Sequence, residues 1–185
     1  MKRRKFLKGA AAGTAVAAST LAAPAIAQGR KEMVIVSTWP RDFPGLGTSA
    51  QRLAKRITDV PGASAVFEGG VVAYADEVKV GTLGVSAEDI RREGAVSEGV
   101  ARQMALGVAK RFGVEAGIGV TGVAGPGGGT AEKPVGTVWL AVALDGEVST
   151  TRLNLVGERH VIRERAAQEA LARLLRFLIG SADGA

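Results

Sequence analysis

A glycine-dense segment at residues 121–130 is the part of the chain best suited to hold a small anion. Glycine reaches positive φ angles and lets backbone N–H groups approach a ligand closely, as an anion nest or an oxyanion pocket requires. A mobile surface connector would have the same composition, so that alternative stays open at this point. The candidate ligand-binding residues are Thr121, Gly122, Gly125, Gly127, Gly128, Gly129 and Thr130.

Tyr74 and Lys79 form a second candidate group, with a role in catalysis. Lysine can replace histidine as a base when burial or a neighbouring positive charge lowers its pKa. If Tyr74 ends a strand and Lys79 lies one turn into the next helix, both side chains can point to one pocket at the end of the sheet. The alternative is a solvated helix face with a tyrosine at its rim.

Several other chemistries are disfavoured. Residues 117–122 have the spacing of a dinucleotide fingerprint, but they begin inside an apolar run and lead to Pro126 instead of a helix. The later glycines lack the Gly-Lys-Ser/Thr of a P-loop. His160 is the only histidine, and no acidic cluster has ligand spacing. We therefore expect no metal and no cofactor, and an exposed His160 in the first turn of the last helix.

Apolar patterning predicts the elements that must position these residues. The fold class we expect is α/β, as a single three-layer domain with a mixed, mostly parallel sheet, a C-terminal hairpin and a long C-terminal helix. Helices are predicted at residues 48–59, 76–83 and 97–112, after a capping Ser86 and at the C-terminus, where Glu169 and Arg173 can pair. Strands are predicted at 33–37, 71–73, 116–120, 135–144 and, after the turn Asp145-Gly146, 148–155.

The basic charge of the chain belongs to its first residues. The 185-residue chain has a net charge of +6, which falls to +1 without the five lysines and arginines of residues 1–27, a segment that contains no acid. We therefore expect no nucleic-acid partner. Arg3-Arg4 followed by an alanine-rich run and Ala25-Ile26-Ala27 resembles a cleavable twin-arginine signal, which predicts a periplasmic location. That run is too short for a stable membrane span, and the absence of cysteine rules out disulfides.

From residue 57 onward the chain resembles the CinA C-terminal domain family. The resemblance rests on residues 59–67, 69–74 and 94–97, on Lys79, and on residues 121–129 with 133–137. It implies a metal-independent amidohydrolase that converts the carboxamide of nicotinamide mononucleotide to the acid and ammonia. It further implies a serine nucleophile assisted by a tyrosine and a lysine, to which Tyr74 and Lys79 correspond, and a homo-oligomer. The glycine segment would then hold the nucleotide or the developing oxyanion.

The nucleophile motif of that family, Glu-Ser-Cys-Thr-Gly-Gly, is missing from this chain. Counting back from Asp59, its serine position falls on Gly47. Thr48 and Ser49 lie beside that position, but helix capping explains both. We therefore expect impaired catalysis, with a small-molecule nucleotide as the ligand.

Residues 37–57 instead resemble the start of periplasmic TRAP-transporter solute receptors. The predicted organisation is a signal at 1–27, a receptor-like strand-loop-helix segment at 28–59 and a deamidase-type domain at 60–180. Two alternatives to an impaired amidohydrolase stay open. One is a non-catalytic periplasmic protein that binds a nucleotide or a TRAP-type solute, and the other is a chimeric chain without a selected function.

Overall fold

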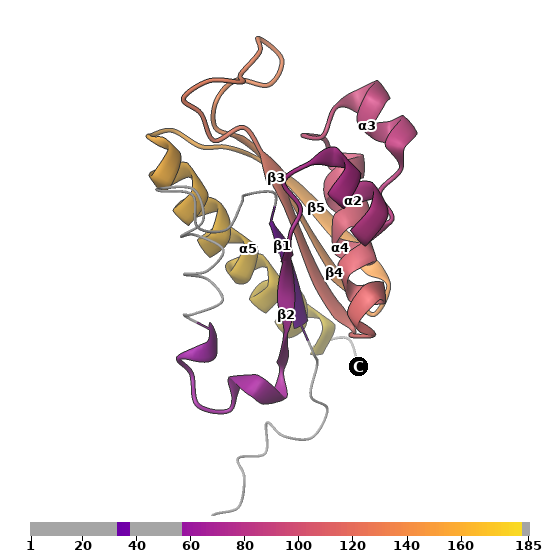
Figure 1. Ribbon diagram of the computed structural model, residues 1–185. Helices are drawn as coiled ribbons and strands as arrows, with labels where there is room; N and C mark the ends of the chain where they lie inside the picture. Colours follow the sequence, from indigo (N-terminus) through magenta and orange to yellow (C-terminus); the bar gives the residue numbers. More distant parts are fainter. Residues whose placement is uncertain (1–32, 38–56, 183–185) are drawn as a thin grey trace, which may run out of the picture.

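The computed structural model describes residues 33–37 and 57–182. It contains one five-stranded sheet in the order β2-β1-β3-β4-β5, flanked by helices (Figure 1). The strands are β1 (Met33–Ser37), β2 (Phe67–Val72), β3 (Ala116–Gly122), β4 (Thr137–Leu144) and β5 (Glu147–Asn154). The helices are η2 (Ala63–Ala65), α2 (Asp76–Leu83), α3 (Ala87–Glu93), α4 (Glu98–Phe112) and α5 (Arg159–Ala182).

Strand β1 lies in the interior of the sheet, between β2 and β3. It pairs in parallel with both neighbours, with Ile35 opposite Gly70 on one side and Ile118 on the other. β3 and β4 pair antiparallel, as do β4 and β5, which form the hairpin predicted at Asp145-Gly146. The predicted α/β class with a mixed sheet is confirmed, and parallel pairing accounts for two of its four strand contacts.

Helices cover both faces of the sheet and so make the three predicted layers (Figure 1). α5 packs on one face, where Ile162, Ala166 and Ala170 join the inward side chains of β3 and β4. α4 packs on the other face, where Met104 and Val108 are fully buried together with Leu83 of α2. Burial of this apolar surface is the main term that stabilises the domain.

Local signals set most of the helix ends. Ser86 and Ser97 cap α3 and α4, since their hydroxyls accept hydrogen bonds from the N–H groups of Asp89 and Val100. α2 has the predicted bounds, and the Glu169–Arg173 ion pair forms at 3.0 Å. β2 begins four residues before the predicted start at residue 71, because its glycines pair with β1 despite their low strand propensity. Most of the helix predicted at 48–59 lies outside the described residues.

Gly119 allows α4 to approach the backbone of β3. A Cβ atom at this position would lie 2.4 Å from the carbonyl oxygen of Ala101 and 2.8 Å from the amide nitrogen of Ala105. Gly119→Ala is therefore expected to lower the free energy of unfolding by about 1–3 kcal/mol, as overpacking of a core does. Urea denaturation measures the change.

The matched control is Gly81→Ala, in the exposed part of α2, where a Cβ would meet no atom within 4 Å. Replacing glycine by alanine inside a helix is expected to stabilise the protein by about 0.5–1 kcal/mol. Equal effects of the two substitutions would contradict the close approach at Gly119.

Candidate functional site

A pocket lies at the carboxyl edge of the parallel strands, where β2 and β3 end at Val72 and Gly122. Its volume is about 290 Å³, near the lower end of the range for small-ligand sites. Loops at this edge of an α/β sheet commonly hold ligands. The lining residues are Tyr74, Asp76, Lys79, Ala95, Val96, Thr121, Gly122, Val123, Ala124, Gly125, Gly127, Gly128 and Arg159.

Tyr74 and Lys79 line the pocket from the connection between β2 and α2. Tyr74 follows the strand and is 59% exposed, whereas Lys79 lies one turn into α2 and is 2% exposed. Lys79 Nζ donates to the carbonyl oxygen of Tyr74 at 3.2 Å and forms an ion pair with Asp76 Oδ1 at 2.8 Å. The placement of both residues at one pocket agrees with the expectation from their spacing.

The contacts of Lys79 orient its amino group. Nζ has four valences: one joins the side chain, and two carry the N–H bonds that donate to Tyr74 and Asp76. A single position on the nitrogen remains for a ligand or for a proton in transit. Asp76, which the sequence interpretation did not single out, is therefore a positioning residue for Lys79.

The loop of residues 123–136, which joins β3 to β4 and is called the glycine loop below, is held in place from three sides. Arg159 Nη1 donates to the carbonyl oxygen of Gly125 at 2.6 Å, and Arg152 Nη2 donates to that of Glu132 at 3.1 Å. Lys133 Nζ donates to the carbonyl oxygen of Glu93. These contacts to α3, β5 and α5 favour a fixed loop over the mobile connector that composition alone left open.

Five of the seven predicted binding residues line the pocket: Thr121, Gly122, Gly125, Gly127 and Gly128. Gly125 and Gly128 have φ values of 75° and 80°, which glycine adopts without strain. The N–H groups of Gly127 and Gly128 donate to no carbonyl oxygen within the described part of the chain. They are two of the backbone donors available to an anion in this pocket.

Gly129 and Thr130 lie outside the lining. A Cβ on Gly129 would be 2.8 Å from the amide nitrogen of Val135, so this glycine serves packing within the loop. The hydroxyl of Thr130 accepts a hydrogen bond from the N–H of Lys133. The pKa of Glu132 lies below its ordinary value, mainly because of a backbone hydrogen bond and secondly because of a hydrogen bond with Thr130. Both residues shape the tip of the loop.

Thr121 connects β3 to the part of the pocket wall that Ala95 and Val96 form. Its side chain is 1% exposed, and its hydroxyl donates to the carbonyl oxygen of Ala95 at 2.8 Å. Ala95 and Val96 belong to the connection between α3 and α4. The hydroxyl of Thr121, a candidate ligand-binding residue, therefore donates within the protein and joins β3 to this connection.

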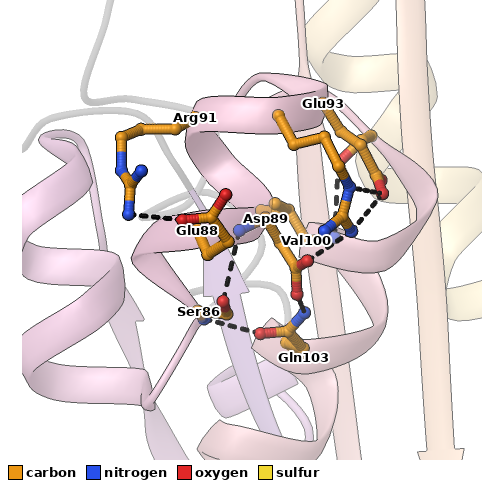
Figure 2. A network of polar contacts seen from close by, with 9 residues as sticks. Ser86, Glu88, Asp89, Arg91, Glu93, Val100 and Gln103 are labelled. Carbon is orange, nitrogen blue, oxygen red and sulfur yellow. Dashed lines mark hydrogen bonds and ion pairs between the residues drawn. The ribbon is translucent and has the colours of Figure 1, made fainter.

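A polar network holds α3 against α4 and supports that wall (Figure 2). Gln103 of α4 accepts from the N–H of Ser86 at 2.6 Å and donates to Asp89 Oδ2 at 2.7 Å. The hydrogen bond from Gln103 is the largest cause of the lowered pKa of Asp89, followed among the favourable contacts by Arg92 and Ser86. The network thus favours the charged form of Asp89.

The lowered pKa of Asp89 predicts a pH dependence of stability. The stabilisation by this carboxylate is complete above its ordinary pKa of 3.8 and is lost as the pH falls through the lower folded-state value. Asp89→Asn is therefore expected to be less stable than the wild-type protein at pH 7, with a difference that closes below pH 3.8. Urea denaturation at several pH values measures it, and a difference that persists at the lowest pH would contradict the role of the charge.

Arg159 is, like Asp76, a charged pocket residue that the sequence alone did not indicate. It lies at the start of α5, next to His160, whose side chain is 68% exposed as expected. A basic residue in the first turn of a helix gives no local signal of a binding role.

Thr48 and Ser49, the candidates for a displaced nucleophile, lie outside the described residues. No cluster of three or more potential metal ligands occurs in the described part of the chain.

A family model for the CinA C-terminal domain matches residues 47–178. The chain belongs to the CinA C-terminal domain family. The match starts ten residues before the predicted start of the resemblance and contains all the predicted site residues. It does not contain β1, which pairs with two strands of the matched region.

Curated relatives and solved structures agree with this membership. A CinA-like protein of Gemmatimonas aurantiaca is 60% identical over 124 residues, which are 67% of this chain and 29% of that protein. A putative competence-damage inducible protein of Halothermothrix orenii is 50% identical over 127 residues, 68% of this chain and 31% of that protein. The chain thus spans about three tenths of the length of these CinA relatives.

Among solved structures, the competence/damage inducible protein CihA of Agrobacterium tumefaciens has a TM-score of 0.70 and 35% identity. That match covers 80% of this chain and 85% of CihA. A competence damage-inducible protein A of Klebsiella pneumoniae has a TM-score of 0.72 and 31% identity, covering 83% of this chain and 89% of its own. The five-stranded fold of this CinA domain therefore has solved counterparts. None of its described helices is long and apolar enough to cross a membrane.

Proposed function

We propose that the chain carries an amidohydrolase-type pocket that binds nicotinamide mononucleotide but hydrolyses its carboxamide poorly. The observation that carries this proposal is the meeting of Lys79, Tyr74 and the glycine loop around one pocket. The expected impairment rests on the sequence, which lacks the Glu-Ser-Cys-Thr-Gly-Gly motif and has glycine at the serine position.

The proposed chemistry is hydrolysis of an amide by water, with a carboxylate and ammonia as products. In the complete form of such a site, a serine hydroxyl would attack the carboxamide carbon, and Lys79 in its neutral form would accept the hydroxyl proton and pass it to the leaving ammonia. Water would then hydrolyse the acyl-serine ester to the carboxylate and restore the serine hydroxyl. The N–H groups of Gly127 and Gly128 would stabilise the negative charge on the carbonyl oxygen. Without the serine, water has to attack the carboxamide directly.

Incubation of the purified protein with nicotinamide mononucleotide tests this proposal, with ammonia release and ligand binding measured separately. We expect binding by calorimetry together with turnover on the order of 10⁶-fold below that of a site with its nucleophile. Robust turnover would overturn the impairment. If it occurs, Thr48→Ala and Ser49→Ala identify a displaced hydroxyl.

A second candidate function is a periplasmic binding protein without catalysis, which the resemblance of residues 1–27 to a twin-arginine signal favours. Calorimetry with small organic acids separates a TRAP-type solute from a nucleotide.

Replacing Arg3 and Arg4 by lysine is expected to abolish export of the protein, and cell fractionation measures how much protein reaches the periplasm. We further propose a homo-oligomer, which size-exclusion chromatography tests.

A further inference from the structure

The outer side of strand β5 has no strand partner among the described residues. β5 is the last strand in the order β2-β1-β3-β4-β5 and pairs only with β4 in the described sheet. None of its side chains is buried, whereas every side chain of β4 except that of Trp139 is buried. The outer main-chain groups of β5 are therefore open to pairing with a further strand.

β5 lacks the features by which natural edge strands avoid such pairing. Its eight residues pair with β4 in one unbroken register, and it contains no proline, glycine or lysine. β2, at the opposite edge, contains Gly69 and Gly70, and its register with β1 shifts between Met33 and Val34. Bulges of this kind protect an edge, so β5 is the edge better suited to association.

The register of the hairpin shows which groups of β5 point outward. The N–H of Leu155 donates to the carbonyl oxygen of Gly136 at 2.8 Å. Because the direction alternates along an antiparallel pair, the odd-numbered residues of β5 bond to β4 and the even-numbered residues point away from it. The carbonyl oxygen of Thr150 accepts the hydroxyl of Thr151 at 2.7 Å and keeps its second lone pair. The residues with outward N–H and C=O groups are Val148, Thr150, Arg152 and Asn154.

We propose that two copies of this chain associate by antiparallel pairing of their β5 strands about a two-fold axis at Thr151. The two sheets then form one continuous sheet, held by main-chain hydrogen bonds between the copies. This inference rests on the homo-oligomer proposed above and gives it a surface. It is independent of the proposed catalysis, because β5 contributes no residue to the pocket lining.

Charge complementarity selects this register. Side chains alternate between the faces of a strand, so residues of one face meet across a two-fold axis only if the axis passes through a residue. With Thr151 on the axis, Thr150 lies opposite the partner's Arg152, at a Cβ separation of about 5 Å. The hydroxyl of Thr150 donates to Glu98 Oε1 at 2.5 Å, so an exposed carboxylate lies beside the partner's Arg152. An axis at Arg152 would instead place two arginines opposite each other, which is unfavourable.

The test is sedimentation velocity of the full chain over a range of concentrations at fixed salt, where we expect a reversible monomer–dimer equilibrium. Arg152→Glu and Glu98→Lys should each weaken the dimer by about 10- to 100-fold, because each places like charges together on both sides of the axis. An equal mixture of the two variants should dimerise like the wild-type protein, because the mixed dimer has two pairs of opposite charge. Mixing does not restore the contact of Arg152 with the carbonyl oxygen of Glu132, so recovery identifies the pair between copies.

Arg176→Glu is the matched control, because it makes the same change of charge at an exposed position on α5. It should leave the dimer unchanged. Thr150→Pro should abolish the dimer without unfolding the chain, because the N–H that it removes points away from β4 and proline is tolerated at such positions. Circular dichroism shows whether each variant is folded, and the charge variants serve as the test if Thr150→Pro is not.

Three results would overturn the inference. A chain that stays monomeric at all concentrations would contradict the homo-oligomer as well. An oligomer that none of the β5 variants weakens, or that Arg176→Glu weakens equally, would leave the homo-oligomer in place but exclude β5 as its surface. A mixture of Arg152→Glu and Glu98→Lys that stays monomeric would contradict the proposed register. Ammonia release by the monomeric variants tests the proposed catalysis separately.

Discussion

Replacement of residues 46–51 by Glu-Ser-Cys-Thr-Gly-Gly is expected to raise ammonia release from nicotinamide mononucleotide by on the order of 10⁶-fold. The six changes are Leu46→Glu, Gly47→Ser, Thr48→Cys, Ser49→Thr, Ala50→Gly and Gln51→Gly. The expected size follows from enzymes in which removing a serine nucleophile costs about this factor. A coupled ammonia assay measures the rate.

The gain requires that the rest of the site is competent. Lys79 is buried and held by two contacts, and the N–H groups of Gly127 and Gly128 are available to an oxyanion. In the restored chain, Lys79→Met should therefore abolish the gain while leaving mononucleotide binding in place. Leu46→Glu with Ala50→Gly is the control without a new nucleophile. A restored chain that binds the mononucleotide but shows no gain would contradict the proposed deamidase chemistry.

Removal of β1 is expected to unfold the domain, although β1 lies outside the family match. A chain of residues 47–185 keeps the matched region but lacks Met33–Ser37. Among the described strands β2 pairs only with β1, and β3 would lose its parallel partner. Backbone hydrogen bonds contribute about 0.5–1.5 kcal/mol each, so losing those on both sides of β1 approaches the total stability of a domain, about 5–15 kcal/mol.

Far-UV circular dichroism and a thermal transition measure the effect. The matched control is a chain of residues 28–185, which lacks only the proposed signal and keeps β1. It is expected to unfold cooperatively, whereas the chain of residues 47–185 should show no such transition. A cooperative transition in the shorter chain would show that the sheet closes without its interior strand.

The elements were predictable where the signals are local. Ser86, Ser97 and the turn Asp145-Gly146 act within a few residues, and the structure has the helices and the hairpin that they indicate. The start of β2 was mispredicted, because glycines there are held by pairing with β1, which no local propensity contains. An element that depends on contacts between residues far apart in the sequence is therefore harder to predict than one that depends on its own residues.

The pocket residues that lie close together in the sequence were predictable, and those that lie far apart were not. Tyr74 and Lys79 could be placed together because one strand end and one helix turn separate them. Composition could not distinguish Gly127 and Gly128, which line the pocket, from Gly129, which packs against Val135. Arg159 meets Gly125 across 34 positions of sequence, so only the tertiary structure shows their contact.

The position of β1 also determines what an exchange of segments between genes would do to this fold. β1 is joined to both neighbours by main-chain pairing, which many extended sequences can supply. A foreign segment that provides five extended residues could therefore take the place of β1 and preserve the sheet. Such an exchange would also replace the residues that follow the strand, so a chain of this architecture could keep its fold and lose a side chain from that segment in the same event.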